Sequence, residues 1–310
     1  MKKRGFLLCG SNENLTKKPN LLLISLFEKA GYEMESYVIS DIDVICSEYT
    51  EGTLYMKEEK VTCPDFAVIA ADVDDYVTAV VKMLEGMGIL CINSFKGITY
   101  ATDKLLCQQE MIEKLVGGLE GVHLPKTILV TGRTSARFLG EQLSYPVILK
   151  VMHGKKGKGV VMAKDEKELS DMLGMVTAAD FGDQIIAQEA IMTSKGRDVR
   201  TMICNGKFTQ SFIRSARNSD FRSNVAQGGE VLPYEAPEHL KRASEKIAQE
   251  LGLAVGSVDF MFGASENEFY FCEANSMPGI LWAEILDPGH MVEQIKKLID
   301  EYPVPAWKEK

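Results

Sequence analysis

Two stretches near the C-terminus are the most informative part of this chain: Ser257-Val-Asp259-Phe-Met261 and Phe269-Tyr-Phe-Cys-Glu273-Ala-Asn275. Large apolar residues surround the acidic residues in both stretches, so that the two read as mostly buried β-strands. Residues 263–268 between them are short and polar, as in the turn of a hairpin. The sequence therefore predicts two adjacent strands that carry acidic and amide side chains.

The oxygen-bearing side chains of this hairpin are expected to converge. Because side chains alternate along a strand, Glu273 and Asn275 share one face, while Cys272 and Ala274 take the other. Asp259 lies across from Cys272 or Glu273, depending on the register. Two carboxylates and an amide oxygen suit a hard cation such as Mg²⁺ that also contacts a phosphate. The hairpin therefore predicts a site for a metal-bound nucleotide.

A simpler interpretation is that one face of the hairpin is wet and carries polar residues for that reason. The neighbours of Asp259 and Glu273 are mostly apolar, however, so the strands read as buried. A buried carboxylate needs a partner, because an unpaired charge is costly to bury. No basic residue lies between Gly252 and Leu286. The neutralising charge must come from a metal or from elsewhere in the fold.

Composition limits the class of protein. The 310 residues suffice for two domains, or for three small ones that share a cleft. A net charge of −9 disfavours a general nucleic-acid-binding protein. The seven cysteines are scattered singly, which argues against a disulfide framework and a zinc site and fits a reducing cytoplasm. The apolar run at the N-terminus is short, and no stretch approaches the length of a membrane span.

The first hundred residues alternate between strand and helix signals. Apolar runs at 6–9, 34–39, 66–70 and 89–92 predict strands, and 21–29 and 76–86 predict helices. This alternation predicts a parallel α/β sheet with right-handed crossovers. The loop at 10–14 could bind a phosphate or carboxylate at a helix N-terminus, but it lacks the glycine spacing of a dinucleotide site.

Two lysines stand out in the next segment. Asp103 is a plausible N-cap for a helix to about residue 115, and Lys104 would project from its first turn. Lys150 ends an apolar strand, and residues 153–159 then form a hairpin tip with three glycines and three lysines. Such a tip can bind phosphate through backbone N–H groups, although a generic turn is the alternative. An inward lysine at Lys150 favours an anionic partner.

An arginine-rich segment follows the strand that ends at Glu189. Arg214, Arg217 and Arg222 lie close to Asn224 in an otherwise acidic protein. A guanidinium binds carboxylate and phosphate through a planar fork, so the cluster suits an acidic substrate and a transferring phosphoryl group. A solvated loop is one alternative, and nucleic-acid contact through nearby phenylalanines is another.

Several motifs, taken in order, resemble the ATP-grasp fold. They are Thr102-Asp-Lys104, Lys150 with its hairpin, Gly196-Arg-Asp198-Val-Arg200, Asp220-Phe-Arg-Ser-Asn224 with Gly228-Gly229, Val258-Asp259 and Glu273-Ala-Asn275-Ser-Met-Pro278-Gly279. Within this fold the chain resembles the RimK-type ligases, which add glutamate or a related amino acid to an amine or a peptide end. The resemblance covers nearly the whole chain.

The resemblance implies an α/β fold with two α+β lobes and an N-terminal parallel α/β domain. Residues 1–96 are expected to form this preceding domain. Residues 97–188 would form the central ATP-grasp lobe with the glycine-rich lid hairpin. Residues 189–310 would form the C-terminal lobe with the metal site.

The resemblance also implies the role of each site residue. Lys104 and Lys150 would contact the phosphates of ATP, Glu189 and Asp198 would lie near the adenosine, and Gly157 and Gly159 would belong to a mobile lid. Asp259, Glu273 and Asn275 would hold Mg²⁺ or Mn²⁺. Arg222 and Asn224 would contact the γ-phosphate or an acyl phosphate, and Arg214 and Arg217 belong to the same catalytic cluster. The family phosphorylates a carboxylate, and an amine then attacks the acyl phosphate to give an amide.

The chain departs from the family pattern at three places. Asn224 is followed by Val-Ala-Gln instead of His-Arg, and Asn275 by Ser-Met instead of Ala-Ser. Asp72, Asp74 and Asp75 crowd a strand end where some members carry an arginine. The substrate pair is therefore expected to differ from that of the best-known member.

The expected partners are ATP, an amino acid with a free carboxylate, and an amine or peptide acceptor, without a membrane. A homo-oligomer is left open. The alternatives are a dipeptide ligase of the D-alanine ligase or glutathione synthetase kind, and a noncatalytic nucleotide-binding protein.

Overall fold

The N-terminal part of the protein is a parallel sheet flanked by helices. The structure, a computed structural model, describes residues 2–45, 53–115, 117–152, 159–178, 184–216, 230–277 and 288–303. The sheet has the order β2 (Glu33–Val38), β1 (Arg4–Cys9), β5 (Phe66–Ala70), β6 (Leu90–Ile92), and these pairings are parallel. Its connections contain α1 (Asn12–Leu15), α2 (Lys18–Lys29), the 3₁₀ helix η1 (Ile39–Asp41) and α3 (Asp75–Gly86). The expected parallel α/β sheet is confirmed.

Helix α3 shows how the local sequence forms these elements. Asp74 caps the helix, because its Oδ1 accepts a hydrogen bond from the backbone N–H of Val77 at 2.8 Å. Val77, Val81 and Leu84 then recur at helical spacing and are buried against the sheet. A small antiparallel hairpin, β3 (Thr53–Met56) and β4 (Glu59–Thr62), is an addition that the sequence analysis did not predict.

The central lobe is an antiparallel sheet with helices on one face. Its order is β10 (Val160–Ala163), β9 (Val147–Val151), β11 (Ile185–Glu189), β8 (Thr127–Val130). Helices α6 (Ala136–Leu143) and α7 (Glu166–Ala178) share a core with Val147, Leu149, Ile185 and Ala187. Because side chains alternate, Lys150 and Gln188 project from the opposite face of the sheet.

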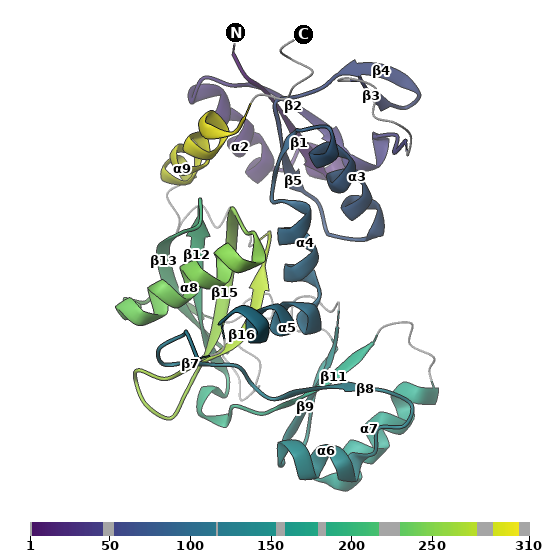
Figure 1. Ribbon diagram of the computed structural model, residues 1–310, viewed down its shortest axis with the longest axis vertical. Helices are drawn as coiled ribbons and strands as arrows, with labels where there is room; N and C mark the ends of the chain where they lie inside the picture. The colour runs from purple at the N-terminus through teal and green to yellow at the C-terminus, as the bar shows by residue number, and fades with distance from the viewer. Residues whose placement is uncertain are drawn as a thin grey trace.

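The largest sheet carries the predicted metal site. Its order is β14 (Glu230–Pro233), β13 (Lys207–Ser215), β12 (Arg197–Cys204), β15 (Val255–Phe262), β16 (Phe269–Asn275), β7 (Val122–His123). Helix α8 (Glu238–Leu251) lies across the middle of this sheet (Figure 1) and buries Leu240, Ile247 and Leu251 in a core with Val258 and Phe260. The charged residues on alternate positions of the strands therefore lie on the face that α8 does not cover.

Two segments connect the N-terminal sheet to the largest sheet. Helices α4 (Phe95–Thr102) and α5 (Lys104–Leu115) lead from β6, and α5 shares the core under α8 through Cys107 and Met111. Helix α9 (Pro288–Glu301) runs back beside α2 (Figure 1), where Val292 and Ile295 pack in one core with Phe27. The boundaries at 96 and 188 remain predictions, while the helices at 95–115 pack against the C-terminal lobe.

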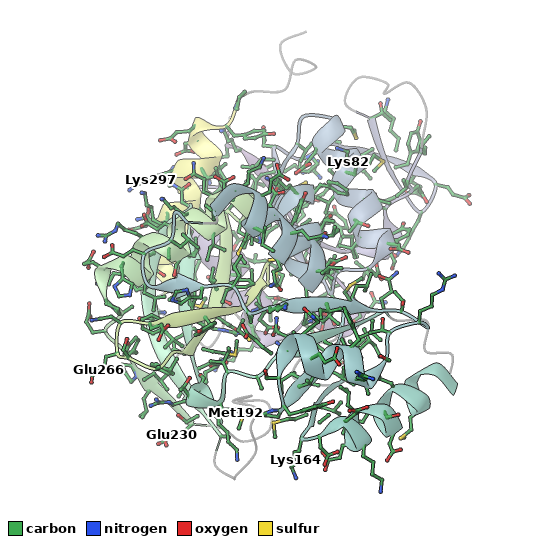
Figure 2. All side chains as sticks on the ribbon, turned by 60° about the horizontal axis from the view of Figure 1, so that its bottom comes forward. Lys82, Lys164, Met192, Glu230, Glu266 and Lys297 are labelled. Atoms are coloured by element: carbon green, nitrogen blue, oxygen red, sulfur yellow. The ribbon has the colours of Figure 1, made fainter. Side chains whose placement is uncertain are left out.

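The central and largest sheets are joined by a short segment between β11 and β12. It contains the 3₁₀ helix η2 (Met192–Ser194), and Met192 marks its place in Figure 2. Ser194 ties this segment to the largest sheet, because its Oγ accepts a hydrogen bond from the backbone N–H of Phe262 at 2.9 Å. This hydrogen bond fixes the connection between the two sheets to the end of β15.

Candidate active site

The register of β15 and β16 brings the predicted metal ligands to one face. Asp259 pairs with Glu273, and Ser257 pairs with Asn275. The Nδ2 atom of Asn275 lies 3.4 Å from Oδ2 of Asp259. Between the two register alternatives for Asp259, the structure therefore selects Glu273, and the three oxygen-bearing side chains lie together as predicted from the hairpin.

A bulge beside Asp259 changes the expectation for Cys272. The register shifts between Asp259 and Phe260, so that Cys272 is an extra residue in β16. Ala274 packs in the core under α8, whereas Cys272 does not belong to that core. Regular alternation, which placed these two side chains on the same face, is therefore wrong at this point. Burial raises the pKa of the Cys272 thiol to about 12, so the thiol stays protonated at neutral pH.

Asp259 is fully buried and is paired with two arginines. The guanidinium of Arg200 binds both carboxylate oxygens of Asp259, with Nε 2.7 Å from Oδ1 and a second nitrogen 2.6 Å from Oδ2. Arg214 adds a third hydrogen bond to Oδ2 at 2.8 Å. Burial by itself would raise the pKa of Asp259, but the two guanidinium charges outweigh burial and hold the pKa below its usual value. The carboxylate is therefore ionised at neutral pH.

The buried charges continue along the sheet as an alternating row. Arg214 also pairs with Asp198, with Nε 2.7 Å from Oδ1, and both side chains are buried. Burial acts to lower the pKa of Arg214, but Asp259 and Asp198 raise it above its ordinary value. Strand pairing sets Asp198 opposite Arg214 and Arg200 opposite Asp259. Asp198, predicted to lie near the adenosine, is thus part of the charge row, and its contact with adenosine remains a prediction.

Arg200 is a site residue to which the sequence analysis gave no role. It lies two positions after Asp198 on β12, so both side chains project from the same face of the strand. That spacing was the available signal. The partner of Arg200, however, is 59 residues away and follows only from the pairing of β12 with β15.

Lys104 lies at the start of α5, as the sequence predicted. The Asp103 side chain caps this helix, because its Oδ1 accepts hydrogen bonds from the backbone N–H groups of Leu105 and Leu106, both at 2.9 Å. The Nζ of Lys104 donates to the backbone carbonyl of Met152 at 3.2 Å. Burial lowers the pKa of Lys104, and Glu273 opposes this effect. Its positive charge therefore acts on the metal-ligand end of β16.

Lys150 lies on the uncovered face of the central sheet. Its Nζ donates a hydrogen bond to Oε1 of Gln188 at 2.6 Å. The positive charge of Lys150 acts on both Lys104 and Cys272. The structure therefore brings the two predicted phosphate-binding lysines to the same region as the metal-ligand strand.

Other predicted site residues lie at the edges of this region or outside the described residues. Glu189 ends β11, and its Oε1 accepts a hydrogen bond from the backbone N–H of Lys126 at 2.8 Å. Gly159 precedes β10 with a φ of +73°, a conformation that favours glycine. Gly157, Arg217, Arg222 and Asn224 lie outside the described residues.

The donor set at the hairpin fits a hard divalent cation. No group of three histidine, cysteine or acidic side chains with metal-site geometry occurs within the ranges that the structure describes. The candidate set instead combines the carboxylates of Asp259 and Glu273 with the amide of Asn275 on paired strands. Few protein ligands, all of them oxygens, suit Mg²⁺ that keeps waters and contacts phosphate. By ligand type these residues suit the metal expected from the fold, while in the structure both oxygens of Asp259 accept hydrogen bonds from Arg200 and Arg214.

Comparison with known proteins identifies the family. The sequence matches the RimK-like ATP-grasp domain over residues 101–299. The chain belongs to this family, and it is an enzyme of the class that forms carbon–nitrogen bonds. A protein of Syntrophotalea carbinolica named probable alpha-L-glutamate ligase is 28% identical over 82% of each chain. A protein of the same name from Coxiella burnetii is 30% identical over 76% of each chain.

Solved structures show the same fold at low sequence identity. The ATP-grasp ligase PsnB, solved with a minimal precursor, has a TM-score of 0.70 at 14% identity and covers 96% of this chain and 99% of its own. The D-alanine–D-alanine ligase of Bacillus anthracis, solved with ATP, has a TM-score of 0.63 at 19% identity and covers 97% and 100%. These likenesses confirm the ATP-grasp fold predicted from the motifs.

Among the described residues, none of the helices combines the length and the apolar character that crossing a bilayer needs.

Proposed function

We propose that this ligase forms an amide between a carboxylate and an amine through an acyl phosphate. One substrate would be glutamate or a related amino acid, and the other an amine or a peptide. The observation that carries the proposal is the row of Asp198, Arg214, Asp259 and Arg200, which adjoins Glu273 on the uncovered face of the largest sheet. The names of the two relatives support glutamate as a substrate.

The proposed reaction has two steps. A carboxylate oxygen of one substrate attacks the γ-phosphorus of ATP, the bond to ADP breaks, and an acyl phosphate forms. The amine of the second substrate then attacks the acyl carbon, phosphate leaves, and the nitrogen loses a proton to water or phosphate. Neither step needs a nucleophile from the protein, in keeping with the protonated thiol of Cys272.

The residues of this chain would neutralise the charge that moves during these steps. Lys104 and Lys150 would contact the phosphates of ATP, and preorganised cations of this kind stabilise a transferring phosphoryl group. The arginines Arg200 and Arg214 would fix the Asp259 carboxylate in its ionised form. Arg222 and Asn224 remain predicted contacts of the γ-phosphate end, Arg217 a predicted member of the catalytic cluster, and Gly157 a predicted part of the lid.

Asp259, Glu273 and Asn275 would hold Mg²⁺ or Mn²⁺. When bound, the metal supplies charge neutralisation for the phosphates of ATP. Its ligands must be deprotonated to bind it, and the low pKa of Asp259 meets this condition at neutral pH.

The test is a substrate panel with two measurements. The protein is incubated with ATP and Mg²⁺ or Mn²⁺ and with pairs drawn from L-glutamate, other amino acids, amines and short peptides, while ADP release and product mass are followed. We expect ADP release that depends on both substrates and a product heavier than its acceptor by one or more glutamate or related residues. Hydroxamate formed from added hydroxylamine would report the acyl phosphate.

The same panel discriminates the alternatives. D-alanine with itself, and γ-glutamylcysteine with glycine, test the dipeptide ligases. If ADP is released only with one of these pairs, the enzyme is a dipeptide ligase and the proposed substrate class is wrong. Absence of ADP release with every pair, in a protein that binds ATP, would favour a noncatalytic nucleotide-binding protein.

A further inference from the structure

A chain of hydrogen bonds runs behind Lys150 through the inside of the central lobe. The Nζ of Lys150 donates to Oε1 of Gln188 at 2.6 Å, and Nε2 of Gln188 donates to Oγ1 of Thr127 at 2.8 Å. The hydroxyl of Thr127 donates to Oε1 of Gln108 at 2.7 Å, and Nε2 of Gln108 donates to the carbonyl of Pro125. Gln188 is 4% exposed and Gln108 is 5% exposed. Buried amides of this kind are costly unless every polar atom has a partner.

The direction of every hydrogen bond in this chain follows from its last member. The carbonyl of Pro125 can only accept, so Gln108 must turn its amide nitrogen toward Pro125 and its oxygen toward Thr127. The single hydroxyl proton of Thr127 is then used on Gln108, or on the carbonyl of Pro125 at 3.0 Å. Thr127 can therefore only accept from Gln188, which leaves the oxygen of Gln188 for Lys150.

The strand register places these residues in one row. Gln188 on β11 pairs with Thr127 on β8, and Lys150 on β9 pairs with Ile186, two residues before Gln188. Thr127, Gln188 and Lys150 thus cross three strands on the face that α6 and α7 leave uncovered. Gln108 comes from α5, one helical turn after Lys104. The chain of hydrogen bonds therefore joins the strand of Lys150 to the helix that begins with Lys104.

We propose that Gln188, held by Thr127 and Gln108, is a positioning residue that sets the direction of the Lys150 ammonium toward the phosphates of the nucleotide. This proposal rests on the phosphate-binding role of Lys150 in the proposed function. A free lysine side chain has many rotamers, and ordering it during binding would cost affinity.

The chemistry of glutamine suits this task better than that of glutamate. The amide oxygen of Gln188 accepts a hydrogen bond from Lys150 without carrying a charge. The ammonium therefore keeps its full positive charge for an anionic ligand. A carboxylate at the same position would form an ion pair with Lys150 and compete with the phosphates.

The experiment uses a matched pair of substitutions at Thr127, which does not itself contact Lys150. Thr127→Val keeps the shape but removes the hydroxyl, so the nitrogen of Gln188 loses its acceptor; Thr127→Ser keeps the hydroxyl. Affinities for ATP and for adenosine are measured by calorimetric titration or by displacement of a fluorescent nucleotide. We expect Thr127→Val to raise the Kd of ATP about tenfold while the Kd of adenosine is unchanged, and Thr127→Ser to restore ATP binding.

A control variant separates this effect from a general loss of stability. Thr201 is a fully buried threonine, whereas Thr127 is partly buried, and Thr201 makes hydrogen bonds to Ser244 and to the carbonyl of Val258 in the core under α8. Because Thr201 is the more deeply buried of the two, Thr201→Val is expected to lower the thermal stability at least as much as Thr127→Val and to leave the ratio of the two Kd values unchanged. A second variant, Gln188→Glu, should weaken ATP binding at least tenfold and spare adenosine, because it pairs Lys150 with a negative charge.

The outcomes are distinct. Equal losses for ATP and adenosine in Thr127→Val, or ATP binding like that of the wild type in both Thr127→Val and Gln188→Glu, would overturn the positioning role. A wild-type protein that binds no ATP would contradict the proposed function instead, before any variant is compared.

Discussion

At the scale of single residues, Asp259 shows how a buried charge is kept in this protein. Its carboxylate is fully buried and receives three hydrogen bonds from Arg200 and Arg214. From the sequence, the neutralising charge was expected from a metal or from elsewhere in the fold; in the structure Arg200 and Arg214 supply positive charge to Asp259. Asp259 is therefore tied to the stability of the sheet as well as to the predicted metal site.

The first prediction concerns this double role. Asp259→Asn keeps the size of the side chain but removes the charge that Arg200 and Arg214 share. We expect the free energy of unfolding to fall by about 3 kcal/mol, as when a buried ion pair loses one partner. Ligase turnover should fall by about a hundredfold or more, as expected for a ligand of the metal site. Urea unfolding and ADP release measure the two effects.

Glu273→Gln is the matched comparison. The arginines Arg200 and Arg214 hydrogen-bond to Asp259 rather than to Glu273. The Glu273 variant should therefore lose turnover to a similar extent and lose less stability. If the two variants lose the same stability, the ion pairs of Asp259 with Arg200 and Arg214 do not stabilise the fold as proposed.

The second prediction concerns pH and Lys104. Burial lowers its pKa from the ordinary value of 10.5, so an alkaline window exists in which Lys104 is neutral in the folded protein and charged in the unfolded chain. Within this window the unfolded chain binds more protons, and the contribution of Lys104 to folding stability becomes more favourable as pH rises. A bound phosphate favours the charged form.

Nucleotide binding should therefore take up a proton in this alkaline window and weaken as pH rises through it. Calorimetric titration of ADP in two buffers with different ionisation enthalpies measures the proton uptake at each pH. Lys104→Arg is the control, because a guanidinium keeps its proton throughout this range. Uptake that persists unchanged in the arginine variant would assign the proton to another group.

At the scale of secondary-structure elements, a capping residue and a glycine determine where two elements of the candidate site begin. These elements are helix α5 and strand β10. Asp103 caps α5 and so determines where Lys104 leaves the helix. Gly159 closes the hairpin of β9 and β10, because its carbonyl accepts a hydrogen bond from the N–H of Val151 at 3.0 Å. A Cβ atom at Gly159 would lie 2.5 Å from a methyl group of Val151. The residue therefore has both a backbone and a packing reason to be glycine.

The third prediction follows from Gly159. Gly159→Ala should lower the free energy of unfolding by about 1–2 kcal/mol, because alanine is strained at positive φ and overlaps Val151. Thermal unfolding measures the change. Gly174→Ala is the matched control, since Gly174 lies in α7 and nothing lies within 4 Å of an added Cβ. The Gly174 variant should be as stable as the wild type or more stable by up to about 1 kcal/mol. If Gly159→Ala is as stable as the wild type, the backbone at Gly159 does not require glycine.

At the scale of the whole molecule, Asn93 joins the N-terminal sheet to the strands of the predicted metal site. It follows β6 and is 2% exposed. Its Nδ2 donates to the carbonyls of Val255 and Ser276, both at 2.6 Å, and its Oδ1 accepts from the N–H of Val255 at 2.8 Å. These bonds hold the start of β15 and the residue after Asn275. The N-terminal sheet thus supports the end of the hairpin that carries the predicted metal ligands.

The fourth prediction tests this support. Asn93→Asp replaces the amide nitrogen by an oxygen, so that the carbonyls of Val255 and Ser276 lose the hydrogen bonds that this nitrogen donates. We expect the free energy of unfolding to fall by about 3 kcal/mol, because each buried polar group that loses its hydrogen bond costs about 1–3 kcal/mol. Asn12→Asp, at an exposed position, should change it by less than about 0.5 kcal/mol. Similar stability of the two variants in urea would rule out Asn93 as a structural link.

Much of the local structure, and the order of the motifs, could be predicted from the sequence. Alternating apolar runs predicted the parallel N-terminal sheet, because burial of one face leaves its period in the sequence. The cap at Asp103 and the hairpin of Asp259 and Glu273 were predicted for similar local reasons. The succession of motifs predicted the ATP-grasp fold, which the family match and the structural likenesses confirm.

The contacts between distant groups, in contrast, follow from the packing of the strands. The pairing of Asp259 with Arg200 and Arg214 depends on the register of three strands, and the separations are 59 and 45 residues. The bulge at Cys272 shifted the alternation by one residue, which no pattern in the sequence indicated. Local patterns record whether a side chain is buried and in which element, whereas the partner of a buried polar group is set by how those elements pack. The sequence therefore predicted that Asp259 needs a positive partner, and the packing of the sheet determined which residues provide it.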